Sequence, residues 1–317
     1  MYDVAALGEL LIDFTCLSTD TDGYPTMAAH PGGAPANYLA ALTKFGAKTA
    51  MIGKVGNDAF GRLLIKTLKG TGIDTRGMLV SDDVFTTLAF VTLDDSGNRE
   101  FSFARKPGAD TQLRFDEIDL GVIDASKVLH FGTLSMTNEP ARDATYKAVE
   151  YAAGRGKLIS FDPNLRKPLW NDLDEAKRQM LWGLRHADVV KISDEETEFL
   201  FSLAPEESAK HIINSFGVRL VYVTCGAEGC FYRTKTASGF VKALSGIAVK
   251  DTTGAGDIFG GSAMYGLLRA GGVPEKLTAE ELENIVSFAC ASAGLSTTRA
   301  GGISSVAELI EVEAAMK

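Results

Sequence analysis

The sequence predicts an α/β protein built on a doubly wound, mainly parallel sheet flanked by helices. From residue 127 onward, short apolar strands alternate with helical segments, which is typical of a parallel sheet covered on both faces. Polar residues also cluster directly after these strands, at 162–166, 193–196 and 224–229. Because the carboxyl ends of parallel strands share one edge of a sheet, we expect these clusters to converge there.

Size and composition are those of a globular protein. The chain has 317 residues, of which 45% are hydrophobic and 23% charged, enough for one large domain or a domain with a small appendage. The net charge of −9 disfavours nucleic acid as a partner. No apolar run approaches the ~20 residues needed to span a bilayer, and the N-terminus lacks the pattern of a signal peptide. The four cysteines have no metal-ligand spacing. We therefore predict free thiols, a cytoplasmic protein and no membrane partner.

The N-terminal elements are predicted in the following order. Residues 4–14 form an apolar run broken by Gly8, Glu9 and Asp13, and we expect one buried first strand. Asp13 then falls at the end of that strand, where open α/β sheets bind ligands, although a turn residue is the alternative. Residues 18–31 are polar and rich in turn residues. After them we expect a helix at 38–45, a strand at 49–55 and a helix at 58–68.

A β-hairpin is predicted further along. Residues 86–93 and 99–103 alternate polar and apolar side chains around a glycine-containing loop at 94–98, and this pattern favours two short antiparallel strands. They differ from the continuous apolar strands elsewhere and are expected to form a separate small sheet. Phe103 and Arg105 lie on or just past it. They are either surface residues, or part of a lid that covers a substrate and excludes water.

The regular part of the chain follows. We expect strands at 127–131, 158–162, 189–192 and 220–224, and helices at 139–154, 173–186, 194–201 and 205–216. The alternating residues 244–250 are expected to form a strand, followed by helices at 258–268, at 280–295 and from about residue 306. No internal repeat or linker divides the chain.

The most informative segment is 251–257, Asp-Thr-Thr-Gly-Ala-Gly-Asp. Its two glycines allow a tight turn and a close approach to backbone N–H groups, and a helix N-terminus follows. Such a place binds anions, most often phosphate. Asp257 would repel a phosphate. It is either the N-cap of the helix, or a general base that takes a proton from an attacking hydroxyl beside the anion site.

A second glycine-rich segment, 31–37, enters the first helix. The amide of Asn37 can both donate and accept, which suits a polyol. Residues 56–63 lack the lysine of a P-loop, and no Gly-x-Gly-x-x-Gly follows the first strand, which argues against a nicotinamide-dependent dehydrogenase. After the later strands, Arg166 offers a planar fork for phosphate oxygens. Glu196 is either an ordinary first-turn glutamate or a ligand of Mg²⁺ through water.

The segments 32–37 and 251–257 together resemble the two signatures of the ribokinase-like (PfkB) carbohydrate kinases, and the resemblance covers essentially the whole chain. Segments 99–103, 106–110, 162–166 and 191–196 are most similar to bacterial fructokinases. The resemblance implies a single three-layer α/β/α kinase domain over residues 1–317, with a small β-sheet lid from segments near 14–31 and 85–110. It also implies a homodimer formed through the lids.

The resemblance further implies transfer of the γ-phosphoryl group of ATP to a primary hydroxyl of a sugar, with roles for particular residues. Catalysis is assigned to Asp257 as general base, with an anion hole at Gly254, Ala255 and Gly256. Sugar contacts are assigned to Asp13, Gly32, Gly33, Asn37, Phe103 and Arg105. ATP contacts are assigned to Asn164, Arg166, Lys191, Thr224, Gly226, Gly229, Asn284 and Ala289. Mg²⁺ is assigned to Glu196 through water, and K⁺ to positions at Asp251, Thr253, Ser296, Arg299, Gly301 and Ser305.

Several functions remain open on the sequence. The expected reaction converts fructose to fructose 6-phosphate. The alternatives within the family are a 2-keto-3-deoxygluconate kinase, whose acidic substrate would need a cation such as Arg105, and a ribokinase. A sugar-sensing protein on the same fold is an alternative of another class. Asp257 beside an anion site argues against a sensor, because a sensor has no need of a base there.

Overall fold

A nine-stranded sheet forms the centre of the protein in this computed structural model, which describes residues 1–93 and 99–317. The strand order is β13-β12-β11-β10-β9-β8-β1-β4-β5. Neighbours from β11 to β5 are parallel, whereas β12 and β13 are antiparallel additions at one edge. The strands are β1 (Tyr2–Leu7), β4 (Thr49–Gly56), β5 (Asp74–Ser81), β8 (Ser126–Gly132), β9 (Leu158–Asp162), β10 (Val189–Ser193), β11 (Leu220–Thr224), β12 (Gly229–Arg233) and β13 (Ser238–Lys242).

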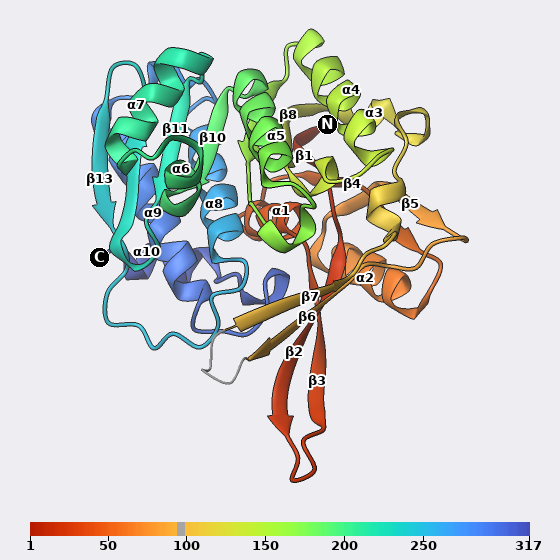
Figure 1. The fold of residues 1–317 in the computed structure, drawn as a ribbon. Coiled ribbons are helices and arrows are strands. Elements are labelled where there is room, and N and C mark those ends of the chain that lie inside the picture. Colours follow the sequence, from red (N-terminus) through yellow and green to blue (C-terminus); the bar gives the residue numbers. More distant parts are fainter. Residues whose placement is uncertain (94–98) are drawn as a thin grey trace.

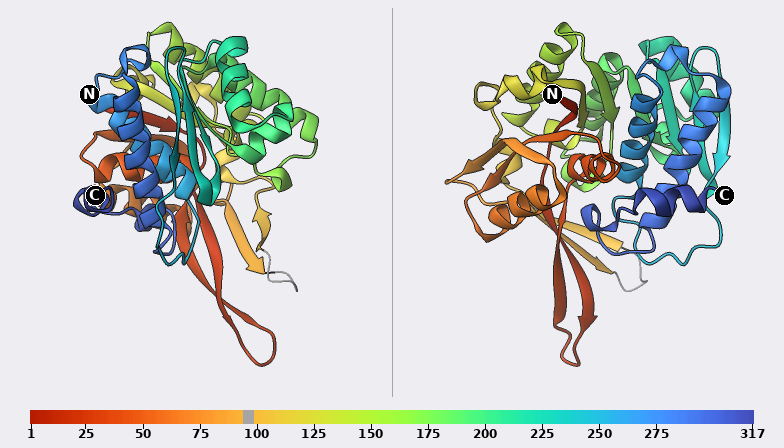
Figure 2. Two further views of the ribbon diagram at one scale, coloured as in Figure 1. Left: turned by 90° about the vertical axis from the view of Figure 1, so that its left-hand side faces the viewer. Right: turned by 180° about the vertical axis from the view of Figure 1, so that it is seen from behind.

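Helices cover both faces of this sheet and complete three layers (Figures 1 and 2). Alternate residues of β1 belong to different cores: Val4 and Ala6 pack in one cluster with α1, α8 and α9, and Ala5 and Leu7 pack in the other with α4, α5 and α7. The predicted doubly wound, mainly parallel fold is confirmed. The helices are α1 (Ala34–Lys44), α2 (Ala59–Thr71), α3 (Leu120–Asp124), α4 (Ala141–Gly154), α5 (Leu173–His186), α6 (Asp194–Phe201), α7 (Pro205–Phe216), α8 (Ala255–Arg269), α9 (Ala279–Ser296) and α10 (Leu309–Ala315). In the part of the chain that the structure describes, none is long and apolar enough to cross a membrane.

A separate four-stranded sheet projects from the end of the molecule where the large sheet's strands finish (Figure 1). Its order is β3-β2-β6-β7, from β2 (Leu11–Thr19), β3 (Pro25–Gly32), β6 (Leu88–Leu93) and β7 (Arg99–Ala104). The strands of the predicted hairpin are confirmed as β6 and β7, which pair antiparallel. The loop predicted at 94–98 lies outside the described residues.

Two predicted strands are wrong. Residues 4–14 form two strands in different sheets, because the backbone leaves the large sheet at Gly8, whose φ is 156°. Asp13 therefore lies on β2 of the small sheet and not at the end of a core strand. Residues 244–250 form no strand. The antiparallel edge of the large sheet is instead formed by the unpredicted hairpin of β12 and β13, which precedes this segment.

Candidate active site

Asp257 lies buried in the first turn of α8, at the edge of the sheet where the parallel strands end. The helix is capped by Gly254, whose φ of 76° places it in the left-handed region, which glycine adopts without strain. Asp257 is therefore not the N-cap. Its carboxylate instead accepts hydrogen bonds from Asn37 Nδ2 at 2.9 Å and from Asn164 Nδ2 at 3.1 Å. Amides from α1 and from the loop after β9 thus fix the carboxylate from two sides.

The surroundings of Asp257 suit a proton acceptor. Burial raises its pKa above that of an ordinary aspartic acid, while Lys191, the hydrogen bond from Asn37 and Arg166 act in the opposite direction. Burial disfavours the charged form of a carboxylate because its hydration is lost. A carboxylate whose pKa is raised toward neutrality is a more effective general base.

A buried ion pair lies behind the first turn of α8. Lys191 Nζ is 3.1 Å from Asp162 Oδ2, and a Cβ added at Gly256 would lie only 3.0 Å from the same ammonium group. Glycine at this position therefore lets the lysine approach the helix N-terminus, where its charge adds to the helix dipole. Burial raises the pKa of Asp162 to about 7, with Lys191 opposing the shift. Asp162 was not predicted as a site residue, although it opens the polar cluster that follows β9.

The predicted sugar residues meet next to Asp257. A Cβ at Gly32 would lie 2.1 Å from Asp13 Oδ2, so a glycine is needed where the carboxylate passes. Burial raises the pKa of Asp13 to about 6; Arg166 lowers it, and Asp257 raises it further, which places these charges in one site. Asn37 Oδ1 is buried and has no hydrogen-bond partner among the described residues. A Cβ at Gly302 would lie 2.2 Å from this oxygen, so the loop after α9 packs against the amide group of Asn37.

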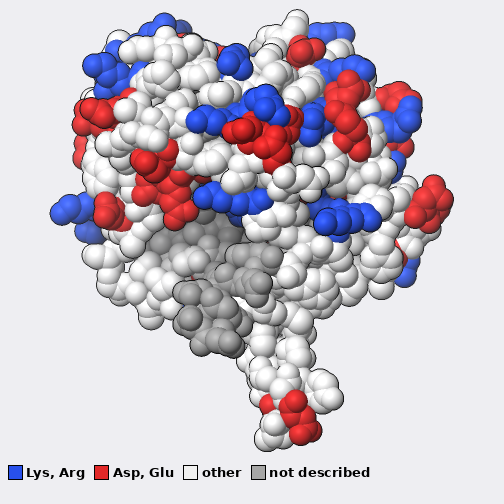
Figure 3. Space-filling model, viewed as in Figure 1, with Lys and Arg blue, Asp and Glu red and all other residues white. Residues whose placement is uncertain are grey.

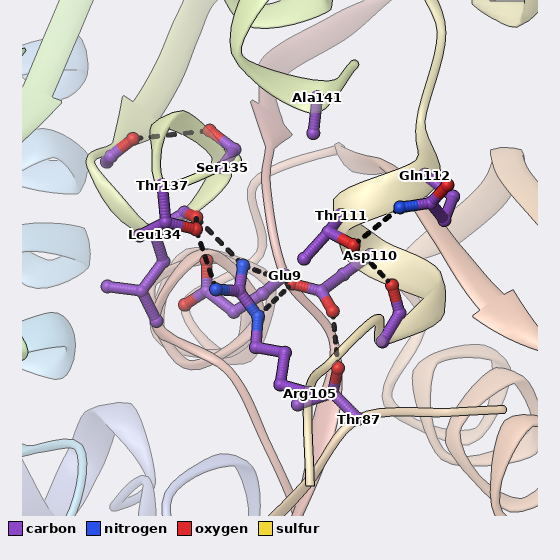
Figure 4. A network of polar contacts seen from close by, with 12 residues as sticks. Glu9, Thr87, Arg105, Asp110, Thr111, Gln112, Leu134, Ser135, Thr137 and Ala141 are labelled. Carbon is purple, nitrogen blue, oxygen red and sulfur yellow. Dashed lines mark hydrogen bonds and ion pairs between the residues drawn. The ribbon is translucent and has the colours of Figure 1, made fainter. Parts of the chain in front are cut away.

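Arg105 is not placed to bind a ligand. Its guanidinium is 3% exposed. It donates to Asp110 Oδ2 from Nε at 2.9 Å and from Nη2 at 2.6 Å. It also donates to Thr137 Oγ1 at 2.7 Å and to the Leu134 carbonyl at 2.8 Å (Figure 4). Phe103, the other lid residue predicted to contact sugar, lies half-buried on β7.

The predicted nucleotide residues are arranged along the ends of β9 to β11 and on α9. Asn164 has a φ of 45°, a left-handed conformation that Asn tolerates better than most residues. Thr224 ends β11, and Gly226 and Gly229 form the turn that follows, with φ values of 52° and 133°. Asn284 is exposed on α9, whereas Ala289 has no exposed surface and packs in the core. Ala289 therefore cannot contact a nucleotide in this arrangement.

Glu196 accepts hydrogen bonds from two backbone segments, one after β9 and one at the start of α6. It forms a capping box with Ser193, in which Glu196 Oε2 accepts from the Ser193 N–H at 2.8 Å. Its Oε1 accepts from the Leu165 N–H at 2.7 Å. The first-turn role is therefore present, and each oxygen keeps one further lone pair for a water molecule. Within residues 1–93 and 99–317, no cluster of three or more His, Cys, Asp or Glu side chains is placed to hold a metal ion.

The residues predicted to surround a monovalent cation are only partly assembled. Asp251 accepts from Thr253 Oγ1 at 2.7 Å and from the Gly301 N–H at 3.0 Å, which joins the loop before α8 to the loop after α9. Ser296 and Ser305 are buried and donate to the carbonyls of Ala293 and Gly302. Arg299 instead extends to Glu311 on α10, at 2.5 Å.

Fold and site together define a phosphotransferase that acts on a polyhydroxyl substrate, and comparisons with known proteins agree. The family model "pfkB family carbohydrate kinase" matches residues 1–309. This chain therefore belongs to the pfkB family of carbohydrate kinases, which confirms the resemblance inferred from the two glycine-rich segments.

The relatives are fructokinases. The chain is 40% identical to Fructokinase-2 of Solanum lycopersicum over 309 residues, covering 95% of this chain and 92% of that protein. It is 38% identical to Fructokinase-1 of Zea mays over 313 residues, covering 98% and 96%. A fructokinase of Xylella fastidiosa with bound ATP superposes with a TM-score of 0.91 at 29% identity, covering 100% and 98% of the two chains. A fructokinase double mutant of Vibrio cholerae O395, in a form with fructose, ADP and potassium ion, has a TM-score of 0.87 at 30% identity, covering 100% and 99%.

Proposed function

We propose that this protein is an ATP-dependent fructokinase that forms fructose 6-phosphate. The observation that carries the proposal is Asp257, a buried carboxylate held by Asn37 and Asn164 at the N-terminus of α8. That position combines a proton acceptor with a site suited to a phosphoryl group. Fructokinases at about 40% identity over almost the whole chain support fructose as the sugar.

The sugar would lie between the two sheets. Asp13 and Asn37 bind its hydroxyl groups beside Gly33, and Gly32 leaves room for the Asp13 carboxylate. Asp257 takes the proton from the primary hydroxyl as the oxygen attacks the γ-phosphorus of ATP. The new oxygen–phosphorus bond forms in line with the bond between the γ-phosphorus and the bridging oxygen of ATP. That second bond breaks, and its electron pair leaves with ADP.

The charge that develops on the transferred group is stabilised by the protein. The N–H groups at the start of α8, from Gly254 to Asp257, point toward the transferred phosphoryl group. One of them, the Ala255 N–H, also donates to the Thr252 carbonyl at 3.3 Å. Lys191 lies behind this turn, and the positive charge of Arg166 lowers the pKa of Asp257. Such preorganised donors supply much of the acceleration in phosphoryl transfer.

ATP would bind along the ends of β9 to β11, with Thr224 and the turn from Gly226 to Gly229 beneath it and Asn284 at its far side. Mg²⁺ held on the phosphates would neutralise part of their charge, and Glu196 would meet it through water, because Mg²⁺ gives up its hydration shell reluctantly. The joined loops at Asp251 and Gly301 are the place that we assign to K⁺.

Arg105 bears on which sugar is used. A keto acid such as 2-keto-3-deoxygluconate needs a cation for its carboxylate, and the guanidinium of Arg105 is already paired with Asp110 in a buried site. Removing a charge from such a pair is costly because the partner is left buried and uncompensated. The ion pair therefore favours a neutral sugar over an acidic one.

The small sheet would act as a lid, and two lids would pair in a homodimer. The tip between β2 and β3 carries acidic side chains, whereas the adjoining surface of these strands is largely uncharged (Figure 3). Leu17 and Tyr24 are 66% and 70% exposed there, and exposed apolar side chains of this kind mark contact surfaces. ATP as phosphoryl donor and four free thiols fit action in a reducing cytoplasm.

A coupled assay of ADP release tests the proposal. Fructose, ribose, 2-keto-3-deoxygluconate and glucose would each be offered with ATP, together with a reaction that lacks sugar. We expect rapid ADP release with fructose and little with the acidic sugar or without sugar. Faster turnover of ribose or of the keto acid would refute the choice of substrate, and no sugar-dependent release with any of them would favour a sensor.

A further inference from the structure

The chain passes between the large and the small sheet at four places in the described residues. These crossings follow β1, follow β3, precede β6 and follow β7. Each crossing contributes a polar group to one buried region at the base of the small sheet. Glu9 lies on the first crossing, Ala34 begins α1 just after the second, Thr87 precedes β6, and Arg105 follows β7.

Two of these crossings are joined through Asp110. Thr87 Oγ1 donates to one oxygen of the Asp110 carboxylate, and Arg105 donates twice to the other oxygen. All three residues are at most 6% exposed. A Cβ at Gly108 would lie 1.8 Å from Thr87 Oγ1 and 3.0 Å from Arg105 Cγ, so the close approach of these side chains depends on a glycine at this position.

The same arginine ties the small sheet to the large unit. Its remaining hydrogen bonds go to Thr137 Oγ1 and to the Leu134 carbonyl, which lie in the segment between β8 and α4. Asp110 belongs to the short 3₁₀ helix η1 (Ala109–Gln112). The end of β7 is therefore held against two elements of the large unit, and Figure 4 shows these groups around the guanidinium.

Glu9 links the two remaining crossings and is not used by the proposed reaction. Its Oε1 accepts from the Ala34 N–H at 2.8 Å, at the start of the helix that carries Asn37. Burial raises the pKa of Glu9 to about 7; Asp110 raises it further and Arg105 lowers it, so these three charges act on one another. Figure 4 places Glu9 beside Arg105.

We refer to these four side chains as the hinge network: Glu9, Thr87, Arg105 and Asp110. We propose that the hinge network is the hinge of the lid and that it positions the small sheet over Asp257, thereby setting the affinity for the sugar. These are positioning residues, since they reach the substrate only through Asp13 on β2 and Asn37 on α1. The inference rests on the proposed sugar kinase function.

Loosening such a hinge has a defined consequence. If the lid spends less time in the binding-competent position, the apparent sugar affinity falls by the same fraction. The proposed ATP residues lie on the large unit, so ATP affinity in the absence of sugar should not change. If the ion pair had only a structural role, its loss would alter overall stability and would not affect the sugar affinity more than the ATP affinity.

The test uses Thr87→Val, which keeps the shape and removes the hydroxyl that donates to Asp110. Glu9→Gln is a second variant, which keeps an acceptor for the Ala34 N–H and removes the charge. We expect the KM for fructose to rise about tenfold, as when the competent fraction falls to about a tenth, with the KM for ATP within about twofold. Amide exchange in β2, β3 and β6 should become faster, while exchange in β9 to β11 stays unchanged.

Ser208→Ala is the control, because Ser208 is also a fully buried hydroxyl residue whose side chain donates a hydrogen bond, to the Leu203 carbonyl at 3.1 Å, but it lies on α7 and not at a crossing. This control should change neither the KM for fructose nor the KM for ATP. Equal changes in both KM values, or unchanged exchange in the small sheet of both hinge variants, would overturn the inference. The exchange measurement needs no turnover, so it remains decisive even if the protein phosphorylates a sugar other than fructose.

Discussion

Replacing Asp257 with asparagine tests whether this carboxylate is the general base. The side chain keeps its shape, but its new NH₂ group must face either Asn37 or Asn164, both of which donate to the native carboxylate. One hydrogen bond is lost, at a cost of about 1 kcal/mol. The variant also no longer buries a charge, which offsets part of that cost. We therefore expect a folded protein with nearly native stability.

The effect on turnover should be far larger. A positioned general base contributes ~10²–10⁴-fold to rate, equivalent to about 3–5 kcal/mol of the activation barrier. The dissociation constants of fructose and ATP should change little, because the other predicted contacts remain. Initial rates of ADP formation at saturating substrates measure the first effect, and calorimetric titration measures the second.

A matched control is available at another helix start. Asp172 caps α5 and accepts from the N–H group of Asp174, and asparagine is as good an N-cap as aspartate. Asp172→Asn should therefore retain full activity. If Asp257→Asn is folded and its turnover number stays within about tenfold of the wild-type value, the assignment of the base is wrong.

Four further outcomes are expected. The turnover number should fall on acidification at a higher pH than for an ordinary carboxylate, because burial raises the pKa of Asp257 and its protonated form cannot accept a proton. In a pH series, kcat/KM for fructose should fall as the pH drops through about 6, where Asp13 takes up a proton and loses its charge-assisted hydrogen bonds; a flat profile down to pH 5 would contradict both statements. Gly32→Ala places a Cβ 2.1 Å from Asp13 Oδ2 and should raise the KM for fructose at least ~10-fold through misplacement of that group, with the KM for ATP as internal control. Gly183→Ala places a Cβ 2.2 Å from the Phe161 ring and should lower the free energy of unfolding by ~1–3 kcal/mol through overpacking, as measured by urea denaturation, with kinetics unchanged.

The second half of the fold could be predicted because local signals and the final packing agree there. The predicted and observed bounds coincide for β9, α5, α6, α7 and β11. Helix α5 begins after Asp172, whose side chain caps it, and α7 begins with Pro205 and ends before Gly217 in the left-handed conformation. Caps and apolar runs are short-range features, so they can be recognised in the sequence without knowledge of the neighbours.

The errors arise where an element depends on a distant partner. The run from residue 4 to residue 14 is apolar throughout, and only the packing of Pro35 against Gly8, where an added Cβ would lie 2.7 Å from Pro35 Cγ, shows why the chain turns there. Residues 244–250 alternate as a strand does, but they pair with no strand in the described residues, and the last two strands of the chain, β12 and β13, pair with each other. Pairing of this kind is a property of the assembled sheet.

In the candidate site, too, local features could be predicted from the sequence and features that depend on distant residues could not. Asp257 was singled out by the glycine turn and the helix beside it, and these are local features. Contact of Arg105 with the sugar was implied by the family resemblance, and its guanidinium was also the candidate cation for an acidic sugar. Whether it is free depends on Asp110, five residues further on, and on Thr137 from another part of the chain. The sequence shows the charge of a residue, whereas its availability is decided by the fold.

The balance of charge around Asp257 explains why its base strength and its anion site can coexist. Asp13 and Asp162 act on the same region, and burial raises the pKa of each of these carboxylates. Lys191, the hydrogen bond from Asn37 and Arg166 act on the pKa of Asp257 in the opposite direction. ATP phosphates would add further negative charge and raise the pKa of Asp257 further. We therefore expect ATP to act at this site as its Mg²⁺ complex, because the metal offsets part of that charge.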